Sequence, residues 1–121
     1  MKKNYELKFL NKLKINIETS DQVQYNYDLF LKYLKNIKIK ELVVLRVAEV
    51  IFRDANIFIE DITLDNINDY VTKTMLYATQ NNVEPIVAIP MLGYIYKRYL
   101  TKDNLLNYDE LKDKEINNGR D

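Results

Sequence analysis

Apolar residues recur every three or four positions along most of the chain, a spacing that predicts helices rather than strands. The clearest stripe predicts a helix that is capped by Ser20 or Asp21 and runs to about residue 37. Its apolar positions are Val23, Tyr27, Phe30, Leu31, Leu34 and Ile37. A shorter stripe formed by Tyr5, Phe9, Leu10 and Leu13 predicts an earlier helix with lysines on its other side. Residues 1–40 are therefore predicted to form a basic, amphipathic helical leader.

Residues 41–55 are apolar on nearly every side, with Arg46, Glu49 and Arg53 as the main polar positions. A run of this length favours a helix over a strand, and a helix that is apolar on most sides is expected to be surrounded by others. We expect Asn56 to end this helix and residues 57–61 to form an extended connection.

Two further helices are predicted in the second half of the chain. The first is expected to begin at Thr63, with Asp65 in its first turn, and to stop at residues 81–82. Pro85, a typical first-turn residue, opens the second, which spans residues 85–100. Within it, Gly93 indicates either a stability cost of about 1 kcal/mol or a close contact with another helix.

These patterns together predict an all-α fold, a single layered array of about five helices in which the helices at 41–55 and 85–100 are central. Residues 102–121 lose the apolar periodicity and end in a run of polar residues, so we expect a polar, disordered tail. Residues 41–101 are then the core of a single domain.

Composition narrows the chemistry that the chain could perform. There is no His, Cys or Trp, and Ser20 is the single serine. This excludes Ser-His-Asp and Cys-His nucleophilic sites and thiolate metal sites. Two glycines are too few for a glycine-rich phosphate loop. We therefore expect no enzymatic activity and no cofactor or metal.

An acidic cluster and a basic segment are candidate sites. Glu60, Asp61, Asp65 and Asp69 lack the spacing and the glycine of a calcium loop, so helix capping explains them better. Residues 1–40 carry nine lysines, interleaved with tyrosines, and a net charge of +5. Such a leader could bind nucleic acid. Zero overall charge and only four arginines favour solvated helix faces instead.

The location of the protein is predicted from two features. Lys2 and Lys3 are not followed by an apolar stretch, so the start does not read as a signal peptide. The longest apolar run, residues 85–96, covers 12 positions, against about 20 needed to span a bilayer. We expect an intracellular protein, in the cytoplasm or nucleus, that is not transmembrane. A small helical domain buries little apolar surface, so we also expect association, including a possible homo-oligomer.

The helices at 64–81 and 85–100 carry the most informative pattern. Ile67, Tyr70, Lys73 and Tyr77 fit a helix of the form Ile-x-x-Tyr-x-x-Arg/Lys. Residues 86–100 fit a very apolar helix that ends in Tyr-Ile/Leu-Asp/Glu-Arg-Leu, with Arg98 at the arginine. Together with the apolar helix before them, residues 41–101 resemble the first part of a cyclin box, particularly that of the cyclin Y-like group. Two departures stand out: Lys97 replaces the acid that pairs with the basic residue of the first helix, here Lys73, and the pattern fades where the third helix of the box should begin.

The resemblance implies a non-catalytic regulatory module that binds and activates a cyclin-dependent protein kinase. Partner contacts are then expected where polar groups end otherwise apolar helices. These residues are Tyr70, Lys73, Tyr77, Arg98 and Tyr99. Two alternatives stay open: a small helical protein-protein interaction module without a kinase partner, and a weak nucleic-acid binder that uses the leader.

Overall fold

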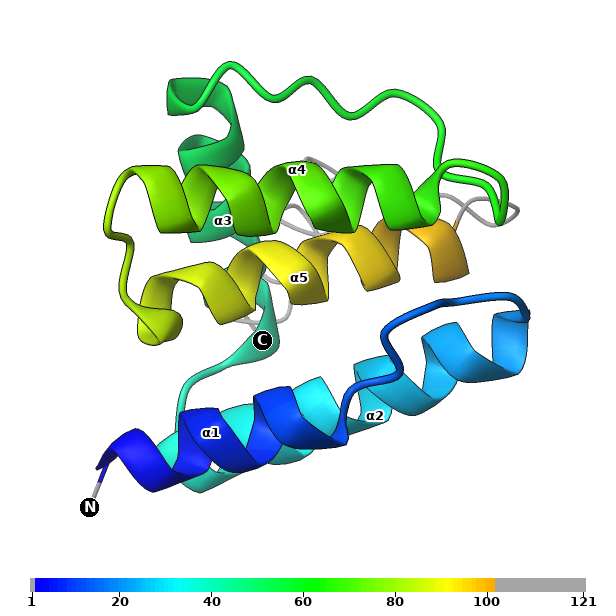
Figure 1. Cartoon of the computed structure of the whole chain (residues 1–121). Coiled ribbons are helices and arrows are strands. Elements are labelled where there is room, and N and C mark those ends of the chain that lie inside the picture. The colour runs from blue at the N-terminus through cyan, green and yellow to red at the C-terminus, as the bar shows by residue number, and fades with distance from the viewer. Residues whose placement is uncertain (1, 102–121) are drawn as a thin grey trace, which may run out of the picture.

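The computed structural model describes residues 2–101, with side chains from residue 5 onward. The predicted tail at 102–121 lies outside the described residues. Within them the fold is all-helical, which confirms the predicted fold class (Figure 1). The helices are α1 (Lys2–Lys12), α2 (Ser20–Ile37), α3 (Glu41–Asp54), α4 (Ile67–Gln80) and α5 (Pro85–Leu100).

Helix α5 is the centre of the array. Its residues 88–96 are all buried, and the four other helices pack against it. The α1–α2 pair lies on one side of α5 and α4 lies on the other, while α3 crosses behind (Figure 1). All five helices contribute to one hydrophobic core, so the predicted leader and the predicted core share the same interior. Pro85 occupies the first turn of α5, as the sequence predicted.

Gly93 marks the closest approach of two helices. A Cβ atom at this position would lie 2.4 Å from Cζ of Phe30, which projects from α2. Phe30 is fully buried, so its ring has taken the volume that a side chain on α5 would need. Of the two interpretations of Gly93, the close helix contact is the one that the structure shows.

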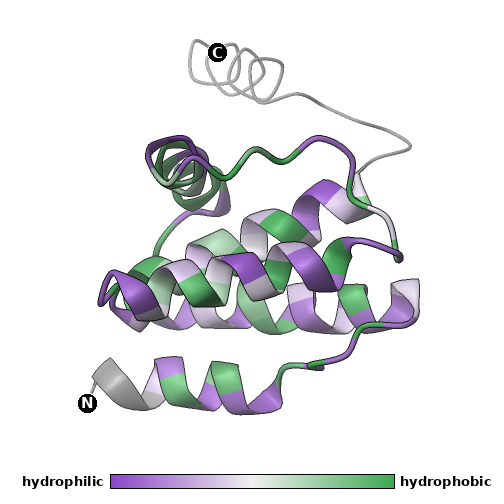
Figure 2. Ribbon diagram, turned by 45° about the horizontal axis from the view of Figure 1, so that its top comes forward, coloured by the Kyte–Doolittle hydropathy of each residue, from purple (hydrophilic) through white to green (hydrophobic). Residues whose placement is uncertain are grey.

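Helix α3 differs from the expectation that it would be central and surrounded. It packs chiefly on α5, through Val44, Leu45, Ala48 and Phe52. On its opposite side Val43, Val47 and Val50 are 51%, 49% and 49% exposed. Figure 2 shows that hydrophobic residues are prominent in α3 and in the connection that follows it. The reason for the difference is that β-branched, apolar positions occur all round this helix, but only one neighbouring helix covers it.

The ends of the helices differ from the prediction in three places. Helix α3 ends at Asp54 with Ala55 as its C-cap, one position before the expected Asn56. Thr19, rather than Ser20 or Asp21, caps α2, because its side chain and that of Gln22 form a reciprocal capping box. Helix α4 begins at Ile67 instead of Thr63. Residues 63–66 form a turn there, closed by the hydrogen bond from the Thr63 amide to Oδ1 of Asn66 (2.8 Å).

Candidate functional site

Three of the five residues predicted to contact a partner lie along one side of α4. Tyr70, Lys73 and Tyr77 are spaced three and four positions apart, which aligns their side chains on a helix surface. The Lys73 Nζ atom lies 5.6 Å from the centroid of the Tyr70 ring, a cation–π contact. The structure therefore brings these three residues together.

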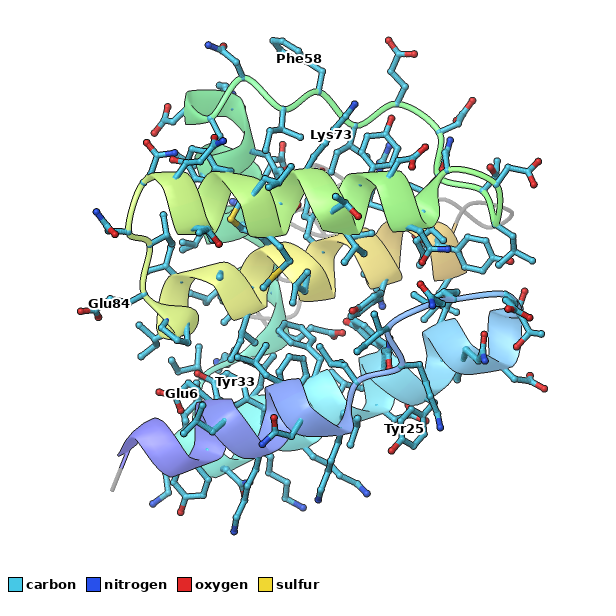
Figure 3. All side chains as sticks on the ribbon, viewed as in Figure 1. Glu6, Tyr25, Tyr33, Phe58, Lys73 and Glu84 are labelled. Atoms are coloured by element: carbon cyan, nitrogen blue, oxygen red, sulfur yellow. The ribbon has the colours of Figure 1, made fainter. Side chains whose placement is uncertain are left out.

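A groove runs between this side of α4 and the segment that follows α3, and we call it the α4 groove. Its volume is about 510 Å³. One wall consists of Ala55, Asn56, Ile57 and Phe58, and the other of Lys73, Leu76, Tyr77 and Gln80. In Figure 3, Lys73 reaches from α4 toward the connection between α3 and α4. Two of the predicted residues, Lys73 and Tyr77, thus line a real concavity.

Phe58 is the most prominent apolar group beside this groove. Its side chain is 72% exposed and points away from the helices (Figure 3). A second groove of about 420 Å³, which we call the α3 groove, lies on its other side. The α3 groove is lined by Glu49, Phe52, Arg53, Ile57, Phe58, Ile59, Glu60 and Tyr94. Phe58 therefore stands between two hollows, each flanked by charged groups.

The connection that carries Phe58 is held at several points. The Ile57 amide donates to the Phe52 carbonyl (3.0 Å), which fixes the exit from α3. Near the other end, Nδ2 of Asn66 donates to the Asp61 carbonyl (2.8 Å). Between these points, Nη2 of Arg98 donates to the Glu60 carbonyl (3.1 Å). An extended segment without a helix of its own is thus anchored to α3, α5 and the start of α4.

Arg98 and Tyr99 have different surroundings, although they are adjacent in the sequence. Arg98 projects from α5 to the connection just described, where it donates to the carbonyl of Glu60, a residue that lines the α3 groove. Tyr99 is only 6% exposed, and its hydroxyl lies 2.5 Å from Oγ of Ser20 at the start of α2. The structure therefore places Arg98 with the exposed connection and Tyr99 in the contact between α5 and α2.

Lys97 pairs with a carboxylate on a different helix. Its Nζ atom lies 3.7 Å from Oε2 of Glu41, at the start of α3, and 5.4 Å from the centroid of the Tyr27 ring. The Tyr27 hydroxyl donates to the same Glu41 oxygen. The cation therefore links α5 to α2 and α3, while Lys73 keeps its contact with Tyr70.

The acidic residues around the connection do not converge. Among the described residues, no group of three or more carboxylates could hold a metal ion. Asp65 lies in the turn before α4, not in its first turn, where Asp69 is the acid. The Asn66 side chain, and not an acid, closes that turn. The capping role predicted for Asp65 is therefore wrong, because the helix begins later than the sequence suggested.

No protein-family model, curated protein or solved structure matches the chain in the comparisons with known proteins. Within residues 2–101, none of the helices has the length and hydropathy required of a membrane-spanning segment.

The sequence prediction missed Phe58. It treated residues 57–61 only as an extended connection, since an isolated aromatic residue outside a helix adds nothing to a periodic pattern. One signal was available: three consecutive large apolar residues, 57–59, stand directly before two acids in a segment that no periodicity assigns to a buried face. Side chains in this extended segment alternate in exposure, so that Phe58 is exposed between half-buried Ile57 and Ile59.

Proposed function

We propose that the protein is a non-catalytic regulatory module, similar to a cyclin, that binds and activates a cyclin-dependent protein kinase inside the cell. The resemblance of residues 41–101 to a cyclin box supports the choice of partner. The observation that supports docking is the exposed Phe58, which lies between two grooves in that same segment. Of the residues expected to contact a kinase, Lys73 and Tyr77 line the α4 groove beside it, and Arg98 bonds to the Glu60 carbonyl two positions further along the connection.

The physical argument for docking rests on how Phe58 is presented. Burial of an exposed phenylalanine side chain contributes about 1.5–3 kcal/mol. Aromatic residues are enriched in protein interfaces and among the residues that dominate their energetics. Because the connection is already anchored through Glu60 and Asp61, little further ordering is needed when a partner covers the ring. Charged residues such as Lys73 and Arg53 would then form the rim that fixes register.

The test is binding of the purified chain to a purified cyclin-dependent-type kinase, measured by calorimetry together with the phosphoryl-transfer rate. Phe58→Ala should weaken binding at least tenfold, or about 1.4 kcal/mol. Tyr25→Ala is the matched control because it removes an aromatic side chain that is 41% exposed on α2, outside both grooves. We expect this control to leave kinase affinity unchanged.

Arg98→Glu tests whether kinase binding depends on the contact that anchors the connection between α3 and α4 to α5. The change removes the donor to the Glu60 carbonyl and reverses the charge beside it. Kinase affinity should fall by more than about 1 kcal/mol, with helical content unchanged by circular dichroism. Affinity that is indifferent to both Phe58→Ala and Arg98→Glu would place the kinase interface elsewhere. Absence of any kinase binding by the parent chain would leave only a helical interaction module.

A further inference from the structure

The surface between α1 and α2 carries a row of lysines. A shallow groove of about 130 Å³ lies between the two helices. It is lined by Tyr5, Lys8, Phe9 and Lys12 of α1 and by Leu29, Lys32, Tyr33 and Asn36 of α2. Figure 3 shows several side chains that project from this pair of helices and end in nitrogen. Three ammonium groups therefore border one groove.

A fourth lysine continues the row beyond the end of α1. The Lys14 Nζ atom lies 5.1 Å from the centroid of the Tyr25 ring. Asn26, which is fully buried, holds the Lys14 backbone in place: its Oδ1 accepts from the Lys14 amide (2.8 Å) and its Nδ2 donates to the Lys14 carbonyl (3.1 Å). The position of Lys14 above Tyr25 is thus built into the fold.

Two partly exposed tyrosines mark the ends of this surface, which we call the basic strip: Tyr5, Lys8, Lys12, Lys14, Tyr25 and Lys32. Tyr5 is 42% exposed and borders the groove together with Asn36, and Tyr25 is 41% exposed beside Lys14. Tyr25 and Asn36 are eleven positions apart on α2, or about 16 Å along the helix axis. The strip is therefore long enough for several nucleotides.

Two acids of α2 border the basic strip, and the other acids lie away from it. By helix spacing, Asp21 and Asp28 adjoin Tyr25, and Asp28 is held by a hydrogen bond from Gln24 (2.9 Å). Glu6 of α1 is buried beside Tyr33, between α1–α2 and the rest of the fold (Figure 3). The acids of the α3–α4 connection lie across α5, at the opposite edge of the molecule (Figure 1). The chain is neutral overall, but lysines outnumber acids nine to four in residues 1–40, and the acids that follow α3 lie across the molecule.

We propose that the basic strip binds single-stranded nucleic acid. Four lysines would neutralise phosphates, and the exposed faces of Tyr5 and Tyr25 would stack on bases at the two ends, the combination by which proteins hold single strands without base-specific readout. A single strand is favoured over a membrane surface because the strip pairs its ammonium groups with two exposed phenol rings, whereas Leu29, the aliphatic residue that lines the groove, is only half-exposed. This surface is separate from the Phe58 grooves, so the proposal does not depend on a kinase partner.

The test measures fluorescence anisotropy of a labelled 12-nucleotide oligo-dT with the full chain at 50, 100 and 200 mM salt. With four phosphate contacts, the logarithm of the binding constant should fall against the logarithm of salt with a slope of about −2.8. Lys12→Gln should reduce the magnitude of that slope by about 0.7. Lys73→Gln is the matched control on α4, and it should change neither the slope nor the affinity.

The tyrosines separate stacking from simple charge attraction. Tyr5→Leu and Tyr25→Leu should each weaken binding about fivefold or more at every salt concentration, with the slope unchanged. Phe58→Ala should leave oligonucleotide binding intact. The proposal is overturned if no binding is detected at 50 mM salt, or if both tyrosine variants bind like the parent. It is equally overturned if inorganic polyphosphate or vesicles of anionic phospholipid compete as well as the oligonucleotide at equal charge.

Discussion

Gly93→Ala should destabilise the protein, although alanine is the better helix former. An ideal Cβ at position 93 lies 2.4 Å from Cζ and 2.5 Å from Cε1 and Cε2 of Phe30. Carbon atoms attract each other best at about 3.5–4.0 Å, so the ring would have to retreat by more than about 1 Å. Phe9 and Tyr27 pack against it, with ring centroids 6.4 and 5.6 Å from that of Phe30. These buried neighbours restrict the movement of the ring.

The expected magnitude combines two opposing effects. Forcing an extra carbon into a well-packed core costs about 1–3 kcal/mol, and the overlap with three ring atoms places this substitution at the upper end. Against this, replacing glycine by alanine inside a helix raises the free energy of unfolding by about 1 kcal/mol. The net loss in the free energy of unfolding is then about 2 kcal/mol. For a domain of this size, that corresponds to a fall in Tm of roughly 8–16 °C.

Thermal and urea unfolding, followed by circular dichroism, would measure this loss. Thr72→Ala, on the exposed side of α4, is the control for adding alanine to a helix, and should change the unfolding free energy by less than about 0.5 kcal/mol. In a Phe30→Leu background the shorter side chain leaves room, so Gly93→Ala should cost nothing there or stabilise by up to about 1 kcal/mol. If Gly93→Ala alone were as stable as the parent, or if its cost were the same in both backgrounds, the steric argument would be refuted.

Three further predictions concern stability. Thr19→Ala removes the cap of α2 and should lower the free energy of unfolding by about 1 kcal/mol in urea titrations. Asn26→Ala leaves the Lys14 amide and carbonyl without their buried partner and should cost about 1–3 kcal/mol by the same assay. Burial, assisted by the charge of Glu6, raises the pKa of Tyr33 to about 12, above its ordinary value of 10.0. The folded chain therefore keeps a proton that the unfolded chain releases. The stability that Tyr33 contributes in this way should be complete below pH 10 and be lost between pH 10 and 12. Tyr33→Phe should make this fall shallower in unfolding measured at pH 9 and 11.

The sequence identified the number and type of helices because each of them buries a definite side. In α2, for example, Val23, Tyr27, Phe30 and Leu34 are all buried, as their spacing predicted. The helix ends were harder to predict from the sequence, since they depend on local hydrogen bonds. The capping box at Thr19 could have been read from its Thr-x-x-Gln spacing, whereas the turn closed by Asn66 gives no such signal.

The candidate site was only partly predictable, because a groove depends on which elements meet. The spacing of Tyr70, Lys73 and Tyr77 is enough to place them on one side of α4. It could not separate Tyr99, which packs toward α2, from its neighbour Arg98, since both end the same helix. The exposed valines of α3 show the same limit: composition reveals an apolar helix, but not how many neighbours are available to cover it.

The central position of α5 also affects how the protein folds during its synthesis. Among the described helices, α5 is the last in chain order, yet the apolar sides of α2 and α3 find most of their partners on it. About 60 residues separate the end of α2 from the end of α5, which takes roughly 3–12 s at ribosomal rates of 5–20 residues per second. During that interval Phe30 and its neighbours on α2 have no α5 to pack against, so the nascent chain exposes a hydrophobic surface that chaperones would recognise.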